Sequence, residues 1–415
     1  MWDLASGALL QVLRPPLGAG HEGKLSAVAI TPDGSIVATA GWTGWDSDGT
    51  ASIYLFERAS GRMQQRLPGL PNVIFHLAVS PDGRFLAAAL GGGEGMRIYD
   101  LRTNTEVARD RDYGDSSYWI EFDRQGRLLT TCADGWLRLY DAKFHLLAKR
   151  QAAGGRQPFA ARFSPDGALV AVGFADTTAV NVLDSTDLTL RYAPDTTGVD
   201  NGDLSTVAWS RDGQRLYAGG RYVQGEGIVP ILQWSQAGRG PLTRLPTATD
   251  TLMDLRPLAD GRLVFGAQDP VLGVLARTEA RLWTQGPATV DYRGLHSALR
   301  VSQDGRVVEF GFDVLQPEQR WHPRSARLHL ATGRLLVDPL APASGVPVHP
   351  PRTTGLALHN WQDRADPRLN DAPLALAPYE TSRALAIAVD GQSFVLGTDW
   401  RLRLFDRQGQ PLWAV

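Results

Sequence analysis

Two short stretches of the sequence have glycines and acids at spacings that bind ligands in other proteins. GAGHEG carries Gly18, Gly20 and Gly23 at the spacing of a dinucleotide-binding loop, which holds a pyrophosphate at a helix N-terminus. Here the glycines precede the strand-like run KLSAVAI, so we expect an ordinary turn. DSDGT, with Asp46 and Glu57 at calcium-loop spacing, lacks the glycine and the oxygen ligand that such a loop needs in its middle. We expect a polar loop there, with a weak cation site as the alternative.

The eight histidines and the single cysteine form no zinc-binding or catalytic spacing. His322, His329, His349 and His359 lie in one irregular part of the sequence, where metal binding is the alternative to ordinary loop and strand histidines. Cys132 follows the run LLTT on a predicted inner strand, so a buried, unreactive thiol is expected. We therefore predict no catalytic, cofactor-binding or metal-binding residue, and a chain that is not an enzyme.

The elements that would position a binding site come from one phrase that occurs eight times, as in AITPDGSIVATA and RFSPDGALVAVGF. Its turn glycines are Gly34, Gly83, Gly126, Gly167, Gly213, Gly261, Gly305 and Gly391. Six of the seven spacings between them lie between 41 and 49 residues, and the last is 86. A period in the forties built from short strands is typical of a β-propeller blade. We predict an all-β propeller of about eight four-stranded blades, with seven as the alternative.

Each repeat predicts four strands. In the Pro-Asp-Gly turn, proline presets φ and glycine takes the left-handed position, so the first two strands form a hairpin. The third strand ends in an aromatic and an acidic residue, as in Tyr99-Asp100, Tyr140-Asp141 and Phe405-Asp406. The fourth strand is more polar, as in RMQQRL, which fits a solvated outer edge.

These features resemble the WD-repeat family of propellers over nearly the whole chain. Only Gly20-His21 keeps the family's Gly-His pair, and the third-strand tryptophan is often Tyr, Phe or Leu. The resemblance implies a degenerate member, in which the family's His–Ser/Thr–Trp hydrogen-bond network is incomplete in most blades. Apolar packing between blades is then expected to hold them together.

Several longer stretches, among them VLRPPLGAGHEGKLSAVAI, LNDAPLALAPYETSRALAIA and GTDWRLRLFDRQGQPLW, resemble the propeller portion of large bacterial proteins. Those proteins carry a caspase-like peptidase domain elsewhere in the chain. The resemblance is to the non-catalytic part, and no peptidase motif carries over. It implies a scaffold or sensor module whose partner is such a peptidase domain, in cis or in trans.

The whole chain, residues 1–415, is predicted to be one propeller domain with an irregular Pro-rich insertion around residues 339–380. A hairpin insertion on an outer edge is favoured there, and a ninth, degenerate blade is the alternative. Trp2-Asp3 looks like the end of a repeat, so Ala8–Leu13 is expected to supply the outer strand of the last blade. Pro411–Val415 is the competing strand, and a piece cut from a longer array is a third interpretation.

Composition narrows the classes of partner. The 415 residues carry a net charge of -2, with a pI of about 6.5, which gives no basic footprint for nucleic acid or an anionic membrane. No apolar run approaches the length of a membrane span, and one cysteine cannot form an internal disulfide. We expect a soluble, cytoplasmic monomer that needs no cofactor.

The loops that join second to third strands are predicted to gather at one end of the blades as a protein-binding surface, because aromatic residues and arginine dominate hot spots. The residues assigned to this surface are Trp42, Trp45, Asp46, Asp48, Trp136, Arg221, Tyr222 and Trp400. Further acids of the same loops are Glu94, Asp134, Asp176, Asp269 and Asp399. The competing interpretation is that the acids cap turns and the aromatics pack between blades. The alternative function, an enzyme or small-molecule receptor in the central channel, is disfavoured because the inner strands look small and apolar.

Overall fold

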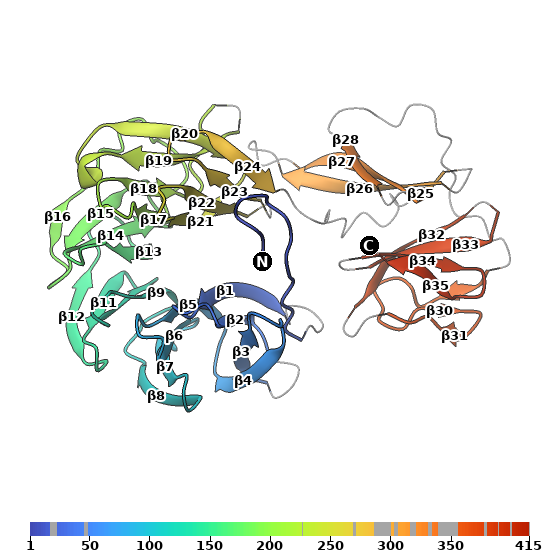
Figure 1. Cartoon of the computed structure of the whole chain (residues 1–415), viewed down its shortest axis with the longest axis horizontal. Coiled ribbons are helices and arrows are strands. Elements are labelled where there is room, and N and C mark those ends of the chain that lie inside the picture. The colour runs from blue at the N-terminus through green and yellow to red at the C-terminus, as the bar shows by residue number, and fades with distance from the viewer. Residues whose placement is uncertain are drawn as a thin grey trace. The chain divides into compact units, whose positions relative to one another are not determined.

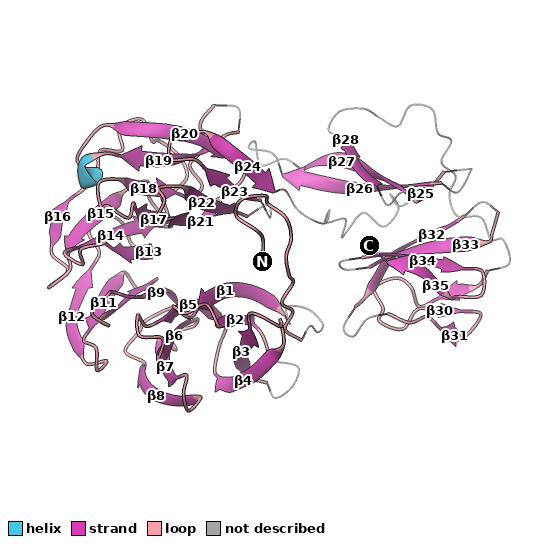
Figure 2. Ribbon diagram, viewed as in Figure 1, coloured by secondary structure: helices cyan, strands magenta, loops and turns pink. Residues whose placement is uncertain are grey.

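A computed structural model of the chain shows that it is built almost entirely of β-strands (Figure 2). The structure describes residues 1–16, 23–44, 49–225, 227–268, 271–285, 300–302, 306–315, 321–330, 334–338, 356–376, 380–388, 390–398 and 401–414. Within these ranges the one helix is a short 3-10 turn, η1 (Gln236–Gly238). The chain divides into two compact units, Met1–Gly286 (unit 1) and Pro287–Val415 (unit 2). The prediction of a single domain over the whole chain stays a prediction.

Unit 1 contains six four-stranded antiparallel sheets, and in each the strands follow one another in sequence order. The first three sheets are formed by β1 (Lys24–Ile30), β2 (Ile36–Trp42), β3 (Ala51–Glu57) and β4 (Met63–Leu70), by β5 (Ile74–Val79), β6 (Phe85–Leu90), β7 (Met96–Asp100) and β8 (Thr105–Asp110), and by β9 (Ser117–Phe122), β10 (Leu128–Cys132), β11 (Trp136–Tyr140) and β12 (Leu146–Gln151). The next three are formed by β13 (Pro158–Phe163), β14 (Leu169–Phe174), β15 (Val180–Asp184) and β16 (Leu190–Tyr192), by β17 (Thr206–Trp209), β18 (Leu216–Gly219), β19 (Val229–Trp234) and β20 (Leu242–Ala248), and by β21 (Leu252–Pro257), β22 (Leu263–Ala267), β23 (Leu272–Leu275) and β24 (Arg281–Gln285).

The first strand of each sheet in unit 1 lies toward the interior of the unit, and the fourth strands lie on its periphery (Figure 1). Each first strand contacts the next one, from β1 to β5 and onward to β21. The second strands carry small apolar residues, as in FLAAAL of β6, which let neighbouring sheets approach closely. Ile53 and Leu55 of the first sheet pack with Leu86 and Ala88 of the second. The core therefore lies between adjacent sheets.

The predicted turn between first and second strands is confirmed wherever its glycine is described. Gly83, between β5 and β6, has a φ of 73°, in the region that favours glycine. The Asp82 carboxylate accepts hydrogen bonds from the Ser80 hydroxyl (2.5 Å) and the Arg84 N–H (3.1 Å), and the Ser80 bond is the main reason that the pKa of Asp82 is lowered. The same bond from a hydroxyl group two residues earlier is made by Asp33, Asp166 and Asp212 at three other turns. Gly305 lies outside the described residues.

The described residues of unit 2 form two four-stranded sheets and one three-stranded sheet. Their strands are β25 (Arg300–Val301), β26 (Val307–Leu315), β27 (Trp321–His329) and β28 (Arg334–Asp338), then β29 (Leu358–His359), β30 (Arg368–Leu369) and β31 (Ala372–Pro373), and finally β32 (Ser382–Ile387), β33 (Ser393–Thr398), β34 (Leu402–Asp406) and β35 (Pro411–Ala414). The eight four-stranded sheets of the two units agree with the prediction of about eight blades.

The three-stranded sheet lies in the part of the sequence where the repeat is interrupted. Leu369 and Leu374 pack against Phe394 and Phe405, whose rings stack 5.2 Å apart on the last sheet. The opposite face of the last sheet packs on β26 and β27, so this sheet is covered on both faces within unit 2. The described part of the segment therefore packs on a face of the last sheet, and the hairpin insertion and the ninth, degenerate blade both stay predictions. Residues 339–355 of the predicted insertion lie outside the described residues.

The outer strand of the last sheet is β35, which pairs with β34 across a short turn. The expectation that Ala8–Leu13 fills this position is therefore wrong. A strand that follows its partner after a few residues closes a much shorter loop than one from the other end of the chain, and loop closure costs less entropy when the loop is short.

The N-terminal segment instead contacts unit 1, the unit to which it belongs. Trp2 and Leu9 form an isolated β-bridge, and the Leu4 carbonyl between them accepts a hydrogen bond from Trp283 Nε1 (3.1 Å). Further along, Leu13 packs on Tyr54 and Phe56 of the first sheet. The segment thus connects the sixth sheet of unit 1 with the first.

Candidate interaction surface

The four described members of the predicted binding surface differ in how exposed they are. Trp42, at the end of β2, is 37% exposed, and Trp136, at the start of β11, is partly exposed. The Arg221 side chain is 61% exposed, and it donates to the Ala175 carbonyl (2.8 Å). Tyr222 is only 4% exposed and packs in the core, so its ring is not on the surface. Trp45, Asp46, Asp48 and Trp400 lie outside the described residues.

The described acids of these loops bind groups of the protein itself. Asp176 accepts the backbone N–H groups of Arg156 (2.8 Å) and Gln157 (3.1 Å), and Glu94 pairs with Arg111 (2.6 Å). These bonds connect the loop after the second strand with the loop that precedes the first strand. Asp269 and Asp399 lie outside the described residues. For the described acids, the interpretation that they cap turns fits the structure.

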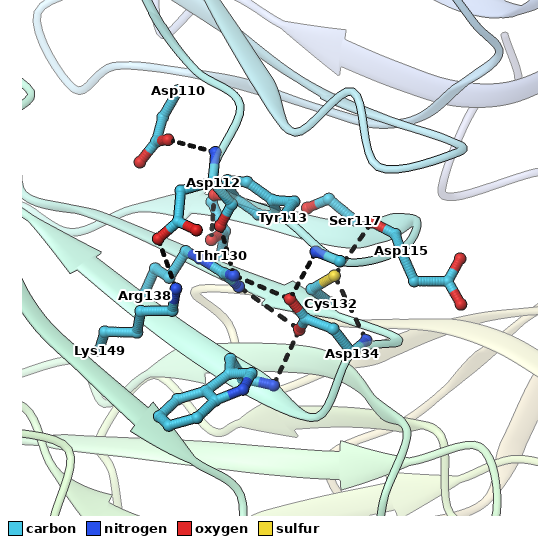
Figure 3. A network of polar contacts seen from close by, with 12 residues as sticks. Asp110, Asp112, Tyr113, Asp115, Ser117, Thr130, Cys132, Asp134, Arg138 and Lys149 are labelled. Carbon is cyan, nitrogen blue, oxygen red and sulfur yellow. Dashed lines mark hydrogen bonds and ion pairs between the residues drawn. The ribbon is translucent and has the colours of Figure 1, made fainter.

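Asp134 makes the largest set of such bonds (Figure 3). Its carboxylate accepts from the backbone N–H groups of Gly114 and Trp136 (both 3.0 Å) and pairs with Arg138 (2.8 Å). The Arg138 side chain is 1% exposed, and its guanidinium lies 3.9 Å from the centre of the Tyr113 ring. Burial acts to raise the pKa of Asp134, but the hydrogen bond from Arg138 and the Gly114 amide outweigh it and lower this pKa to about 2.

A network of hydroxyl groups connects the second and third strands of the same sheet, β10 and β11, to the loop that precedes β9. The Tyr113 hydroxyl lies 2.7 Å from the Thr130 hydroxyl and 3.0 Å from the Tyr140 hydroxyl. Tyr140 in turn donates to Asp110 (2.8 Å). This sheet therefore has a buried polar network of tyrosine and threonine, although apolar packing alone was expected to replace the family's His–Ser/Thr–Trp network.

Cys132 is fully buried, as expected from the sequence. Its thiol donates to the Asp115 carbonyl (3.1 Å) and accepts the Asp134 N–H (3.4 Å). Burial is the main cause that raises the pKa of this thiol to about 12.

The structure therefore predicts that Cys132 resists thiol reagents. A small disulfide reagent at pH 8 is expected to react at least about a hundredfold more slowly with the native chain than with the urea-unfolded chain, because the thiolate is the reactive form. The measurement is the absorbance of the released thiol over time. Equal rates in the two states would contradict the buried position.

An unexpected feature of the loop end is a row of three aromatic side chains, Phe75, Tyr118 and Phe159, which we call the aromatic row. Tyr118 lies 5.2 Å from Phe75 and 5.0 Å from Phe159, measured between ring centroids, and all three are partly exposed. They come from the three adjacent inner strands β5, β9 and β13. The row therefore runs across three neighbouring sheets.

Each member of the aromatic row lies in a β-bulge at the start of its strand. The pairing of β9 with β10 skips Tyr118, because Ser117 pairs with Cys132 and Trp119 with Thr131. The pairing of β5 with β6 skips Phe75 at the same point of the strand, and the pairing of β13 with β14 skips Phe159. The Thr131 hydroxyl donates to the Phe159 carbonyl (2.5 Å), which satisfies a backbone group that the bulge removes from the ladder.

The sequence carries a signal for this row that lies outside the predicted binding loops. Each of the three aromatic residues precedes the turn glycine of its own repeat by the same number of residues. Alternation of apolar and polar residues does not reveal a bulge, since the extra residue shifts the face on which later residues lie.

The centre of unit 1 is more polar than the inner strands suggested. His76 of β5 stacks on Trp119 of β9 with 3.8 Å between ring centroids, and its Nδ1 lies 2.9 Å from the Ile120 carbonyl oxygen, to which it donates. Burial, followed by the positive charge of Arg162, lowers the pKa of His76 to about 3. The imidazole is therefore neutral at physiological pH.

Charged residues from three inner strands meet beside this pair. Arg162 of β13 bonds to Glu121 of β9 (2.7 Å) and to Asp254 of β21 (3.0 Å), and Asp254 also pairs with Arg256 (2.7 Å). Since β13 and β21 belong to sheets that are not adjacent, these ions approach each other across the interior. The description of the inner strands as mostly small and apolar was wrong in this respect. Among the described residues, no three His, Cys, Asp or Glu side chains are grouped to hold a metal ion.

Comparison with known proteins agrees with the repeated sheets. Residues 9–54 match the family model "WD domain, G-beta repeat". A chain in a crystal structure of the mitotic checkpoint complex aligns with a TM-score of 0.53 at 17% identity, covering 75% of this chain and 89% of that chain. The fold is a WD40-type β-propeller. WD40 propellers generally act as protein-interaction scaffolds, although a shared fold does not specify a partner.

Curated WD40 relatives match shorter stretches. Small ribosomal subunit protein RACK1 of Schizosaccharomyces pombe is 35% identical over 92 residues, which is 21% of this chain and 25% of that protein. Human transducin beta-like protein 2 is 26% identical over 152 residues, which is 34% of this chain and 32% of that protein. The match thus spans about a third or less of the length of these relatives. No helix among the described residues is long and apolar enough to cross a membrane.

Proposed function

We propose that this chain is a non-catalytic protein-interaction module that binds its partner at the loop end of unit 1. The observation that carries the proposal is the aromatic row, Phe75, Tyr118 and Phe159. Partly exposed aromatic rings that are held rigidly by the backbone bury large areas at a low entropic cost. Trp136 lies at the same end of the sheet as the aromatic row. Its loop follows Cys132, and Cys132 pairs with Ser117, the first residue of β9, which precedes Tyr118.

The relatives support the same class of function. One is a ribosomal subunit protein, and the structural neighbour is part of a checkpoint complex, so both occur in multi-protein assemblies. The fixed geometry of the loop end also fits a binding surface, because the acids there hold the loops and the aromatic rings remain partly exposed. Pre-organised surfaces of this kind lose little freedom when a partner binds.

The identity of the partner, the cellular location and the assembly of the chain are proposed from the sequence. The partner that the sequence favours is a caspase-like peptidase domain, in cis or in trans, for which the propeller acts as a sensor or docking module. We place this function in a cytoplasmic monomer in which the two units form one propeller. These parts are proposals, and the first is tested by adding a purified caspase-like domain to the experiment below.

The proposal predicts that substitution of the aromatic row abolishes partner binding. A displayed library of random peptides is selected on the immobilised chain, and the affinity of enriched peptides is measured by calorimetry. Replacing Phe75, Tyr118 and Phe159 by alanine is expected to weaken binding at least about thirtyfold, since hot-spot residues contribute about 2 kcal/mol or more. Circular dichroism and the thermal midpoint show whether the variant is folded.

A matched control removes three exposed apolar side chains from the periphery, Leu146, Leu147 and Leu190. This control variant is expected to bind the same peptides as the unmodified chain. If no peptide is enriched over bare support, or if both triple variants lose binding equally, the aromatic row is not the binding surface.

A further inference from the structure

A cavity of about 250 Å³ opens at the other end of the inner strands, where the turns between first and second strands lie. Four arginines line it, Arg124, Arg162, Arg211 and Arg256, together with the acids Glu121 and Asp123. The cavity lies within unit 1 and receives residues from four of its sheets. It is separate from the aromatic row, which lies at the opposite end of the same strands.

The acids near this cavity already have partners. Asp123 is buried and bonds to Arg127 (2.7 Å), which lies outside the cavity lining. Glu121 bonds to Arg162, and Asp254, just behind the lining, bonds to both Arg162 and Arg256. Three carboxylates therefore face five guanidinium groups, which leaves an excess of two positive charges.

The excess resides on Arg124 and Arg211. Among the described residues neither side chain makes an ion pair, and both are exposed at the rim of the cavity. In the wall, the Arg162 Nε is buried and has no hydrogen-bond partner among the described residues. Arg162 is held in place, because its guanidinium lies 4.4 Å from the Trp119 ring and its carbonyl accepts from Trp209 Nε1 (3.0 Å). The cavity thus combines two guanidinium groups that make no ion pair with described residues with a third, Arg162, that is held rigidly in its wall.

We propose that this cavity binds a phosphate monoester. A phosphate monoester carries a charge of about -1.5 to -2 at neutral pH, which matches the excess of two guanidinium charges, whereas one carboxylate carries only half as much. The planar N–H fork of arginine fits phosphate oxygens in pairs. A volume of about 250 Å³ is at the small end for ligand sites, so it suits one phosphate and a few further atoms.

The remainder of the ligand has a place to extend. A second cavity of about 270 Å³ adjoins the first and shares Arg211 and Pro257 with it. Arg215 and Arg277 line this second cavity together with two acids, Asp212, which accepts from the Ser210 hydroxyl, and Asp260, which pairs with Arg262. A phosphorylated side chain of a peptide and a small phosphorylated metabolite would both present the same group to the four arginines.

The test measures binding of inorganic phosphate, a hexose phosphate, and a short phosphoserine peptide with its unphosphorylated form, by calorimetry on the full chain. We expect phosphate-dependent binding that the Arg124→Gln/Arg211→Gln double variant weakens at least about tenfold, equivalent to about 1.4 kcal/mol. Tighter binding of the hexose phosphate identifies a metabolite as the source, and tighter binding of the phosphopeptide identifies a protein side chain.

The control removes the same amount of charge elsewhere, with Arg150→Gln/Arg244→Gln on the outer strands β12 and β20. This control variant is expected to bind phosphate as the unmodified chain does. The proposal is overturned if no phosphate compound binds, if the unphosphorylated peptide binds equally well, or if both double variants weaken binding to the same extent. Loss of peptide selection through the aromatic row would leave this result unaffected, since the two sites share no residue.

Discussion

Replacing Asp134 by alanine is expected to lower the stability of the β9–β12 sheet by about 3–5 kcal/mol, because it leaves the buried Arg138 guanidinium without its counter-ion. The substitution also removes the acceptor for the N–H groups of Gly114 and Trp136. Native-state hydrogen exchange of amides in β10 and β11 measures the loss. Because the folded-state pKa of Asp134 is depressed, the stability from the pair is present above about pH 4 and is lost as the pH falls toward 2.

Asp176→Ala is the matched control for this prediction. Asp176 also accepts two backbone N–H groups, but it is exposed and pairs with no buried cation, so a loss of only about 1 kcal/mol is expected there. Similar losses at both positions would show that the buried guanidinium is not the reason for the cost at Asp134.

Replacing Glu380 by alanine is expected to destabilise the last sheet of unit 2 by a similar amount, about 3–5 kcal/mol. The Glu380 side chain is 0% exposed, and both of its oxygens bond to the Arg403 guanidinium, with Nε–Oε1 and Nε–Oε2 distances of 2.9 and 3.0 Å. Hydrogen exchange of amides in β33 and β34 reports the change. The measurement uses the full chain, with exchange read separately from peptides of each unit.

A compensating double variant sharpens this second prediction. Glu380→Leu combined with Arg403→Met removes both charges and keeps the volume, so most of the lost stability should return, as is typical when a buried pair is replaced by apolar residues. If the double variant is as unstable as Glu380→Ala, the cost arises from packing, and the uncompensated charge is not its cause.

The four-stranded sheets could be predicted from the sequence because the turn between the first two strands of each is a local feature, whereas the three-stranded sheet β29–β31 could not. Proline, aspartate and glycine act within four residues, so Gly83 and its counterparts mark the sheets wherever they occur. The buried arginines could not be predicted in this way. Arg97, Arg138 and Arg403 look like solvated residues in a strand, and their burial depends on acids that loops bring to them.

The candidate sites show the same limit. Trp42 and Trp136 could be predicted because they lie at the loops that the repeat defines, while Tyr222, three residues beyond the end of β18, turns inward to the core. The contact between Arg162 and Asp254 joins residues 92 positions apart. Alternation along one strand shows which residues share a face, but it does not show that two distant strands face one another across an interior.

The bulge at the start of the inner strands has a consequence for how such a protein diversifies. The bulge occurs in six of the inner strands. The residues at the bulge are Ser26 in β1, Phe75 in β5, Tyr118 in β9, Phe159 in β13, Met253 in β21 and Arg383 in β32. These side chains already range from a hydroxyl to a guanidinium within one chain. Because the bulged residue has no cross-strand partner, a substitution there changes the surface without changing any ladder pair. New recognition specificities are therefore accessible through single substitutions, while the inherited framework continues to fold as before.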